Sequence, residues 1–216
     1  MIKTAEDMAK EQKEISVAEF FEKNRHLLGF DNPTKALLTV VKEAVDNSLD
    51  ACEEGGVLPE IKVEIKDLGD NKYRVSVEDN GPGIPQKYIG RALGQMLAGT
   101  KFHRNVQLRG QQGIGVSGVT LFSQVTTGKP LFIRTSTGNG KVYEAEVMID
   151  ITKNRAEIIS KNEYSQYWRG TEIEGEVKGV KFNLSERSPF EYLRRTAIAN
   201  PHAKTVSYTH LTLPTK

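Results

Sequence analysis

The segment Glu43-Ala-Val-Asp-Asn47-Ser-Leu-Asp50 does most to decide the fold, because it lies inside a long helical pattern and carries polar groups at helical spacing. At 100° per residue, Glu43, Asn47 and Asp50 share one face, opposite an apolar face. Neighbours one turn apart lie about 5–6 Å from each other. Glu43 is therefore placed to deprotonate a water and Asn47 to offer an amide oxygen to Mg²⁺. The alternative is the ordinary solvated face of an amphipathic helix.

Outward from this segment, the helix is predicted to begin at Asn32-Pro33 and to stop at Gly55-Gly56. The remaining pattern consists of further helices and of strands joined by hairpin turns, without regular βαβ alternation. It predicts an α+β fold, a two-layer α/β sandwich with a mixed, mostly antiparallel sheet and helices on one face. The other predicted helices are Val17–Leu28, a helix starting in Gly115–Gln124, and Pro189–Ala199, and the predicted strands are Glu60–Leu68, Lys72–Asp79, Val125–Thr135, Val142–Ile151, Ala156–Ser160 and Gly170–Val177.

Asp79 ends a strand of period two, so its side chain is expected on the same side as the apolar Val75 and Val77. A carboxylate placed there needs a polar partner, and the exocyclic amino group of a purine would be one. Gly81 and Gly83 follow and permit unusual dihedrals and close ligand approach. The alternative is a plain turn after a strand.

The third motif is the glycine-rich run Gly110-Gln-Gln-Gly113-Ile-Gly115-Val-Ser-Gly118. Its G-x-G-x-x-G spacing does not indicate a dinucleotide site, because a polar stretch precedes it and no Asp or Glu occurs between Gly118 and Glu144. A glycine-rich loop that runs into a helix N-terminus instead predicts an anion site. The polar run before it, with Gly99-Thr-Lys, is interpreted as a lid over phosphates.

Composition limits the class of protein. The 216 residues suffice for one substantial core, and the net charge of +2 predicts feeble, salt-sensitive DNA binding by this domain. Cys52 is the single cysteine, which excludes a disulfide within the chain and favours a reducing cytoplasm. The sequence holds no apolar run long enough to cross a membrane, so we expect no membrane partner.

Taken together, the three motifs resemble those of the GHKL ATPases, which include gyrase, mismatch-repair ATPases, large heat-shock chaperones and sensor histidine kinases, and whose fold is named the Bergerat fold. The chain is most similar to the B subunits of archaeal-type type IIB DNA topoisomerases, the topoisomerase VI family. The stretches that carry this resemblance are EFFEKNRHLLGFDNP (19–33), LLTVVKEAVDNSLDACEEGG (37–56), GRALGQMLAGTKFHRNVQLRGQQGIGVSG (90–118) and TTGKP (126–130).

The resemblance implies an ATP-binding and ATP-hydrolysing subunit, with Glu43 as the catalytic base and Asn47 as the Mg²⁺ ligand. Asp79 would accept from the adenine amino group, and Thr171 would reach adenine through water unless it is an ordinary strand threonine. The positions that the resemblance assigns to the nucleotide are Asn47, Asp79, Gly81, Gly83, Thr100, Lys101, Gly110, Gln111, Gln112, Gly113, Ile114, Gly115, Val116, Ser117 and Thr171. The implied partners are a second copy on ATP binding, a topoisomerase VI A subunit in an A2B2 heterotetramer, and double-stranded DNA whose supercoils would be relaxed.

The domain prediction follows from the same resemblance. Residues 1–15 would form an arm that straps the dimer, and residues 16–206 the ATPase domain. The family continues into a helix-two-turns-helix domain and a transducer whose lysine contacts the γ-phosphate; neither is present here, so we expect weak hydrolysis. Residues 207–216 show no strand or helix period and are interpreted as a non-native tail or a frayed terminus. Two alternative functions remain, a sensor kinase catalytic domain and a chaperone- or mismatch-repair-type ATP clamp.

Overall fold

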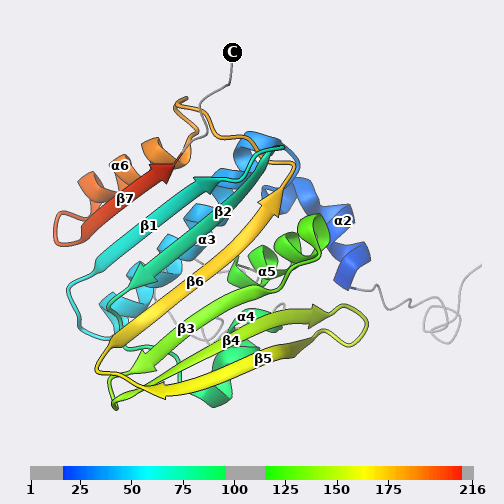
Figure 1. The fold of residues 1–216 in the computed structure, drawn as a ribbon. Helices are drawn as coiled ribbons and strands as arrows, with labels where there is room; N and C mark the ends of the chain where they lie inside the picture. The colour runs from blue at the N-terminus through cyan, green and yellow to red at the C-terminus, as the bar shows by residue number, and fades with distance from the viewer. Residues whose placement is uncertain (1–16, 96–114, 211–216) are drawn as a thin grey trace, which may run out of the picture.

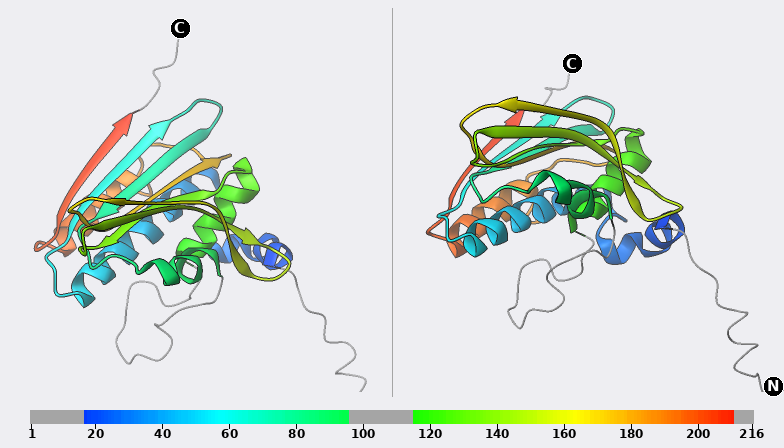
Figure 2. Two further views of the ribbon diagram at one scale, coloured as in Figure 1. Left: turned by 60° about the horizontal axis from the view of Figure 1, so that its bottom comes forward. Right: turned by 90° about the horizontal axis from the view of Figure 1, so that it is seen from below.

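The computed structural model describes residues 17–95 and 115–210. These residues form two layers, a seven-stranded sheet and a set of helices that all cover the same face of it (Figures 1 and 2). The helical segments are α2 Val17–Leu28, α3 Pro33–Glu54, the 3₁₀ turn η1 Gln86–Tyr88, α4 Ile89–Gly94, α5 Gly115–Thr127 and α6 Pro189–Ala199. The predicted two-layer sandwich is confirmed.

The sheet has the strand order β5-β4-β3-β6-β2-β1-β7. Its strands are β1 Glu60–Asp67, β2 Lys72–Asp79, β3 Leu131–Thr137, β4 Lys141–Asp150, β5 Arg155–Ser165, β6 Arg169–Lys178 and β7 Lys204–His210. Every neighbouring pair is antiparallel except β1 and β7, which are parallel. Strand β6 lies between β2 and β3 and so joins two halves of the sheet that are distant in the sequence (Figure 1).

Helix α3 forms where its end signals predicted. The Asn32 side chain accepts from the backbone amides of Thr34 and Lys35, and Pro33 opens the helix at a position where no amide is needed. Its apolar face includes Leu37, Val41, Val45 and Leu49 and is buried against the sheet and α5. This long buried helix gives the site a rigid support.

Two predictions about where elements begin and end are wrong, and β5 also continues to Ser165, beyond its predicted end at Ser160. Val125, Thr126 and Thr127 were expected in a strand because β-branched residues favour one, yet α5 continues to Thr127 and β3 begins at Leu131. The Thr126 hydroxyl donates to the Phe122 carbonyl and the Thr127 hydroxyl to the Ser123 carbonyl, both at 2.7 Å, which fits these threonines to a helix. Gly128, at φ +71°, then ends the helix.

The second error concerns the end of the chain, where no regular element was expected from Ser207 on. Lys204–His210 instead forms β7, paired in parallel with β1. The pairing uses backbone groups, and most β7 side chains are exposed, so no alternation marks this strand in the sequence. The non-native origin of residues 207–216 stays a prediction, and residues 211–216 lie outside the described part.

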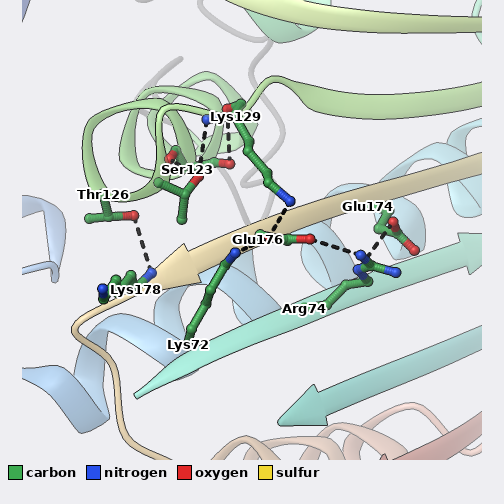
Figure 3. Close-up of polar contacts among 9 residues, drawn as sticks. Lys72, Arg74, Ser123, Thr126, Lys129, Glu174, Glu176 and Lys178 are labelled. Carbon is green, nitrogen blue, oxygen red and sulfur yellow. Dashed lines mark hydrogen bonds and ion pairs between the residues drawn. The ribbon is translucent and has the colours of Figure 1, made fainter. Parts of the chain in front are cut away.

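The face of the sheet that the helices leave uncovered carries a network of charges (Figure 3). Glu176 of β6 receives Arg74 from β2 at 2.8 Å, Lys129 at 2.9 Å and also Lys72. Burial raises the pKa of Glu176, but hydrogen bonds from Arg74, Lys72 and Lys129 outweigh this and lower the pKa to about 2. The charge pairs therefore hold β6 to β2 on the side opposite the core.

Candidate functional site

A row of three buried polar side chains crosses the middle of the sheet. The strand registers place Asp79 of β2 opposite Thr171 of β6, and Thr171 opposite Thr135 of β3. All three point to the helix side and are at most 7% exposed. The prediction that alternation turns Asp79 inward is confirmed, and the sheet brings Thr171 beside it.

The Asp79 carboxylate is held by three donors. Its Oδ2 accepts from the Ser48 hydroxyl of α3 at 2.8 Å, and its Oδ1 accepts from the amides of Gly81 at 2.9 Å and Thr171 at 3.2 Å. Burial raises the pKa of Asp79, and these hydrogen bonds oppose the rise. No cation pairs with Asp79 among the ion pairs of the described residues. A carboxylate has about four acceptor positions, so Asp79 keeps capacity for one more donor.

Thr135 and Thr171 form a pair of hydroxyls whose oxygens lie 3.1 Å apart. The Thr135 oxygen also accepts from the amide of Ile84 at 2.8 Å and can donate to the carbonyl of Gly170 at 3.1 Å. The row is therefore tied to the loop that follows β2.

The predicted glycines are required by close approach. Gly83 has φ +74°, and a Cβ there would overlap the carbonyl of Ser136. At Gly81 a Cβ would lie 3.0 Å from the Asp79 carboxylate. Because both residues are glycines, the loop after β2 can lie close against Asp79 and β3.

The expected polar residues of α3 divide into two groups. Glu43 is 24% exposed and Asn47 is half-buried, whereas Asp50 is buried at 2%. The Asn47 side-chain amide donates to the Glu43 backbone carbonyl at 2.6 Å, which fixes the side chain along the helix. A common solvated face for all three residues is therefore wrong, because Asp50 lies inside the protein.

The start of α5 lies directly against this part of α3. A Cβ added to Gly115 would lie 3.0 Å from Glu43 Oε2 and 3.3 Å from Asn47 Nδ2. Val116 and Ser117, in the first turn of α5, are buried. The start of α5, where the described part of the third motif begins, therefore lies against the middle of α3, which carries the first motif.

Part of the predicted site lies outside the described residues. This applies to Thr100 and Lys101 of the predicted lid and to Gly110, Gln111, Gln112, Gly113 and Ile114 of the predicted phosphate loop.

Several contacts around this candidate site were not predicted from the sequence. Ser48 was passed over although a serine inside a helix, next to Asn47, is a signal for a local polar role. The Asn80 side chain accepts from the Glu60 amide at 2.9 Å and donates to the Leu58 carbonyl at 3.1 Å. It therefore fixes the start of β1 beside the end of β2. No sequence pattern showed that Thr135 belongs to the site, because nothing in β3 indicates that Thr135 pairs with Thr171 of β6.

Beside Glu43, a second polar group links α3 to α6. The Lys42 ammonium lies 2.7 Å from Asp46 and 3.9 Å from Glu43, and the Tyr192 hydroxyl donates to Asp46 at 2.6 Å. Burial lowers the pKa of Lys42, but the hydrogen bond and the charge of Asp46 outweigh this effect, so the pKa is raised overall. Lys42, Asp46 and Tyr192 line a groove of about 500 Å³ between the two helices.

Comparison with known proteins gives three findings. Residues 32–152 match the family model described as histidine kinase-, DNA gyrase B- and HSP90-like ATPase. The chain is 55% identical over 201 residues to the B subunit of type 2 DNA topoisomerase 6 from Pyrococcus horikoshii, covering 92% of this chain and 36% of that protein. It is 49% identical over 199 residues to the Archaeoglobus fulgidus protein of the same name, covering 91% and 33%.

The chain therefore spans about a third of the length of the curated relatives it matches. A solved structure titled as the N-terminal domain of a DNA repair protein superposes with TM-score 0.53 at 21% identity, covering 82% of this chain and 48% of that one. At that identity the likeness concerns the fold. No helix among the described residues has the length and apolar character needed to cross a membrane.

Proposed function

The chain belongs to the family of histidine kinase-, DNA gyrase B- and HSP90-like ATPases, and we propose that it binds ATP between α3, α5 and the row Asp79–Thr171–Thr135 and hydrolyses it there. The observation that carries this proposal is the closeness of Gly115 to Glu43 and Asn47, since a Cβ on Gly115 would lie only 3.0 Å and 3.3 Å from their side chains. It places a helix N-terminus, which attracts phosphate, beside a carboxylate and an amide.

Asp79 would recognise the base. Three protein donors already occupy part of its acceptor capacity, and the remaining position suits an N–H of the adenine amino group. A site built to accept a hydrogen bond rejects an analogue that lacks the donor, because a buried polar group is then left without its partner. Asp79 therefore favours adenine over a 6-oxo purine.

Glu43 would hold and deprotonate the attacking water, and a positioned base contributes roughly 10²–10⁴ in rate. The fit to Mg²⁺ is good, because Asn47 offers one amide oxygen and Mg²⁺ usually takes few protein ligands together with waters and phosphate oxygens. When bound, Mg²⁺ would supply positive charge against the phosphates. The remaining phosphate contacts are assigned to residues 110–117, of which Gly115, Val116 and Ser117 lie at the start of α5.

At the level of the whole protein, we propose the ATP-hydrolysing subunit of a type IIB DNA topoisomerase. The supporting observation is the identity of 55% to a relative named as the B subunit of type 2 DNA topoisomerase 6. ATP binding would bring two copies together, and an A subunit would complete an A2B2 enzyme that passes one DNA duplex through another. Relaxation of supercoiled DNA by the full-length protein with its A subunit tests this, and ATP-dependent phosphotransfer to a histidine without relaxation would favour a sensor kinase.

The nucleotide site is tested by calorimetry with a non-hydrolysable ATP analogue and Mg²⁺. Asp79→Asn should abolish measurable binding, since an amide nitrogen would then face the amino group. Glu43→Gln should keep binding and lose hydrolysis. Glu157→Gln, on the exposed strand β5, is the matched control and should change neither. Unchanged affinity in Asp79→Asn would refute the base-recognition role.

A further inference from the structure

We propose that Thr135 is a positioning residue for the base: its hydroxyl orients the Thr171 hydroxyl so that Thr171 donates toward the N1 edge of adenine. This inference rests on the proposed function and concerns the same site. It adds a residue from a third strand that makes no direct contact with the nucleotide.

The hydroxyl contacts define the possible arrangements. The Thr135 oxygen accepts from Ile84 N–H at 2.8 Å, and its single proton has two acceptors, Gly170 O and Thr171 Oγ1, both at 3.1 Å. If that proton goes to Gly170, Thr171 must donate back to Thr135 to keep the pair bonded, and it then shows the base only lone pairs. If the proton goes to Thr171, the Thr171 hydroxyl is turned outward as a donor.

Adenine selects between these arrangements. Its edge offers N–H groups at the 6-position and a lone pair at N1, so the complementary protein edge is an acceptor followed by a donor. Asp79 supplies the acceptor, and Thr171, directly opposite it in the register, is held as a donor toward the base when Thr135 donates to it. Thr171 would reach N1 either directly or through one water.

The surroundings hold this pair in place. Thr135 is 0% exposed and Thr171 is 7% exposed, and both lie on paired strands. A hydroxyl in such a position has few alternative partners, so removal of the Thr135 hydroxyl should change the orientation of the Thr171 hydroxyl. A purely structural role for Thr135, as the partner of Ile84 N–H, is the competing explanation.

The test compares ATP with 1-deaza-ATP, in which N1 is replaced by C–H, by calorimetry with Mg²⁺ under non-hydrolysing conditions. Unmodified protein should bind ATP about 5–10-fold more tightly, the worth of one ordinary hydrogen bond. Thr135→Val should reduce this ratio by weakening ATP binding alone, because the Thr171 hydroxyl is then no longer held in one direction, while Thr135→Ser should retain the preference. Thr135→Cys, which fills similar space with a weak donor, serves if the valine variant does not fold.

Thr126→Val is the matched control, because the Thr126 hydroxyl likewise donates to a carbonyl and accepts from an amide, that of Lys178, far from the row (Figure 3). It should keep the ratio. Equal weakening of both nucleotides by the Thr135 variants, or a ratio of one in the unmodified protein, would overturn the inference and leave ATP binding intact. Failure of the unmodified protein to bind either nucleotide would overturn the proposed function as well.

Discussion

Replacement of Ser48 by alanine should destabilise the protein in a pH-dependent way. The Ser48 hydroxyl supplies a 2.8 Å hydrogen bond to the buried Asp79 carboxylate, and in the described contacts it is the donor to Oδ2. A hydrogen bond to a charged group is worth about 1.5–3 kcal/mol. We expect Ser48→Ala to lower the free energy of unfolding by about 2 kcal/mol at pH 7, or Tm by roughly 4–8 °C for a domain of this size.

The pH dependence follows from the pKa of Asp79, which burial already raises and which should rise further without Ser48. Because the folded state then binds the proton more tightly than the unfolded state, stability is greatest below the unfolded pKa and falls as pH rises through the folded pKa. The gap between variant and parent should therefore shrink as Asp79 is protonated in acid.

Urea unfolding of both proteins between pH 3 and 8 measures this gap. Ser160→Ala is the matched control, since the Ser160 hydroxyl also donates to a carboxylate at 2.8 Å, that of Glu146, but in an exposed position. It should cost less than about 0.5 kcal/mol. A Ser48→Ala effect that is the same at every pH, or no larger than that of the control, would refute the reasoning.

Three further outcomes are expected. Gly170→Ala should cost more than about 3 kcal/mol in urea unfolding, because φ is +142° and a Cβ would overlap the carbonyl of Asp79, whereas Gly128→Ala, with positive φ but open space, should cost about 1 kcal/mol; similar losses would contradict this. Glu176→Gln should flatten the acid side of the stability curve, because a pKa lowered to about 2 contributes up to about 3 kcal/mol that is lost as pH falls from 4.5 to 2; an unchanged acid limb would count against the charge network. Gly115→Ala should reduce ATP turnover without lowering Tm, because its Cβ would press on the predicted base and its neighbouring amide; full turnover would show that this contact is loose.

Sequence signals were reliable where they are local. The Asn32 cap and Pro33 identified the start of α3. Gly69, Asp70 and Asn71, all at positive φ, form the turn between β1 and β2, which is one of the hairpin turns that the pattern predicted in general. Alternation alone turned Asp79 inward, because the side chains of a strand point to opposite faces.

The sequence could not predict which distant groups meet. Ser48 and Asp79 are 31 positions apart, and Thr171 and Asp79 are 92 apart, so no periodic pattern connects them. The first contact depends on how α3 packs on β2, and the second on the insertion of β6 between β2 and β3, so both depend on packing of the whole fold. The strand β7 was missed for the same reason: it forms because the edge of β1 is available for pairing, and its own sequence does not show this.

The central position of β6 also governs when the site can appear during synthesis. The hairpin β1–β2 and the meander β3–β4–β5 are each built from neighbouring segments and can form early. Neither contains the whole of the proposed nucleotide site, because β6, residues 169–178, lies between Asp79 on β2 and Thr135 on β3. A nascent chain that ends before residue 169 would carry all three sequence motifs but only part of the proposed site. ATP binding by such a chain is therefore not expected until β6 has joined the two halves of the sheet.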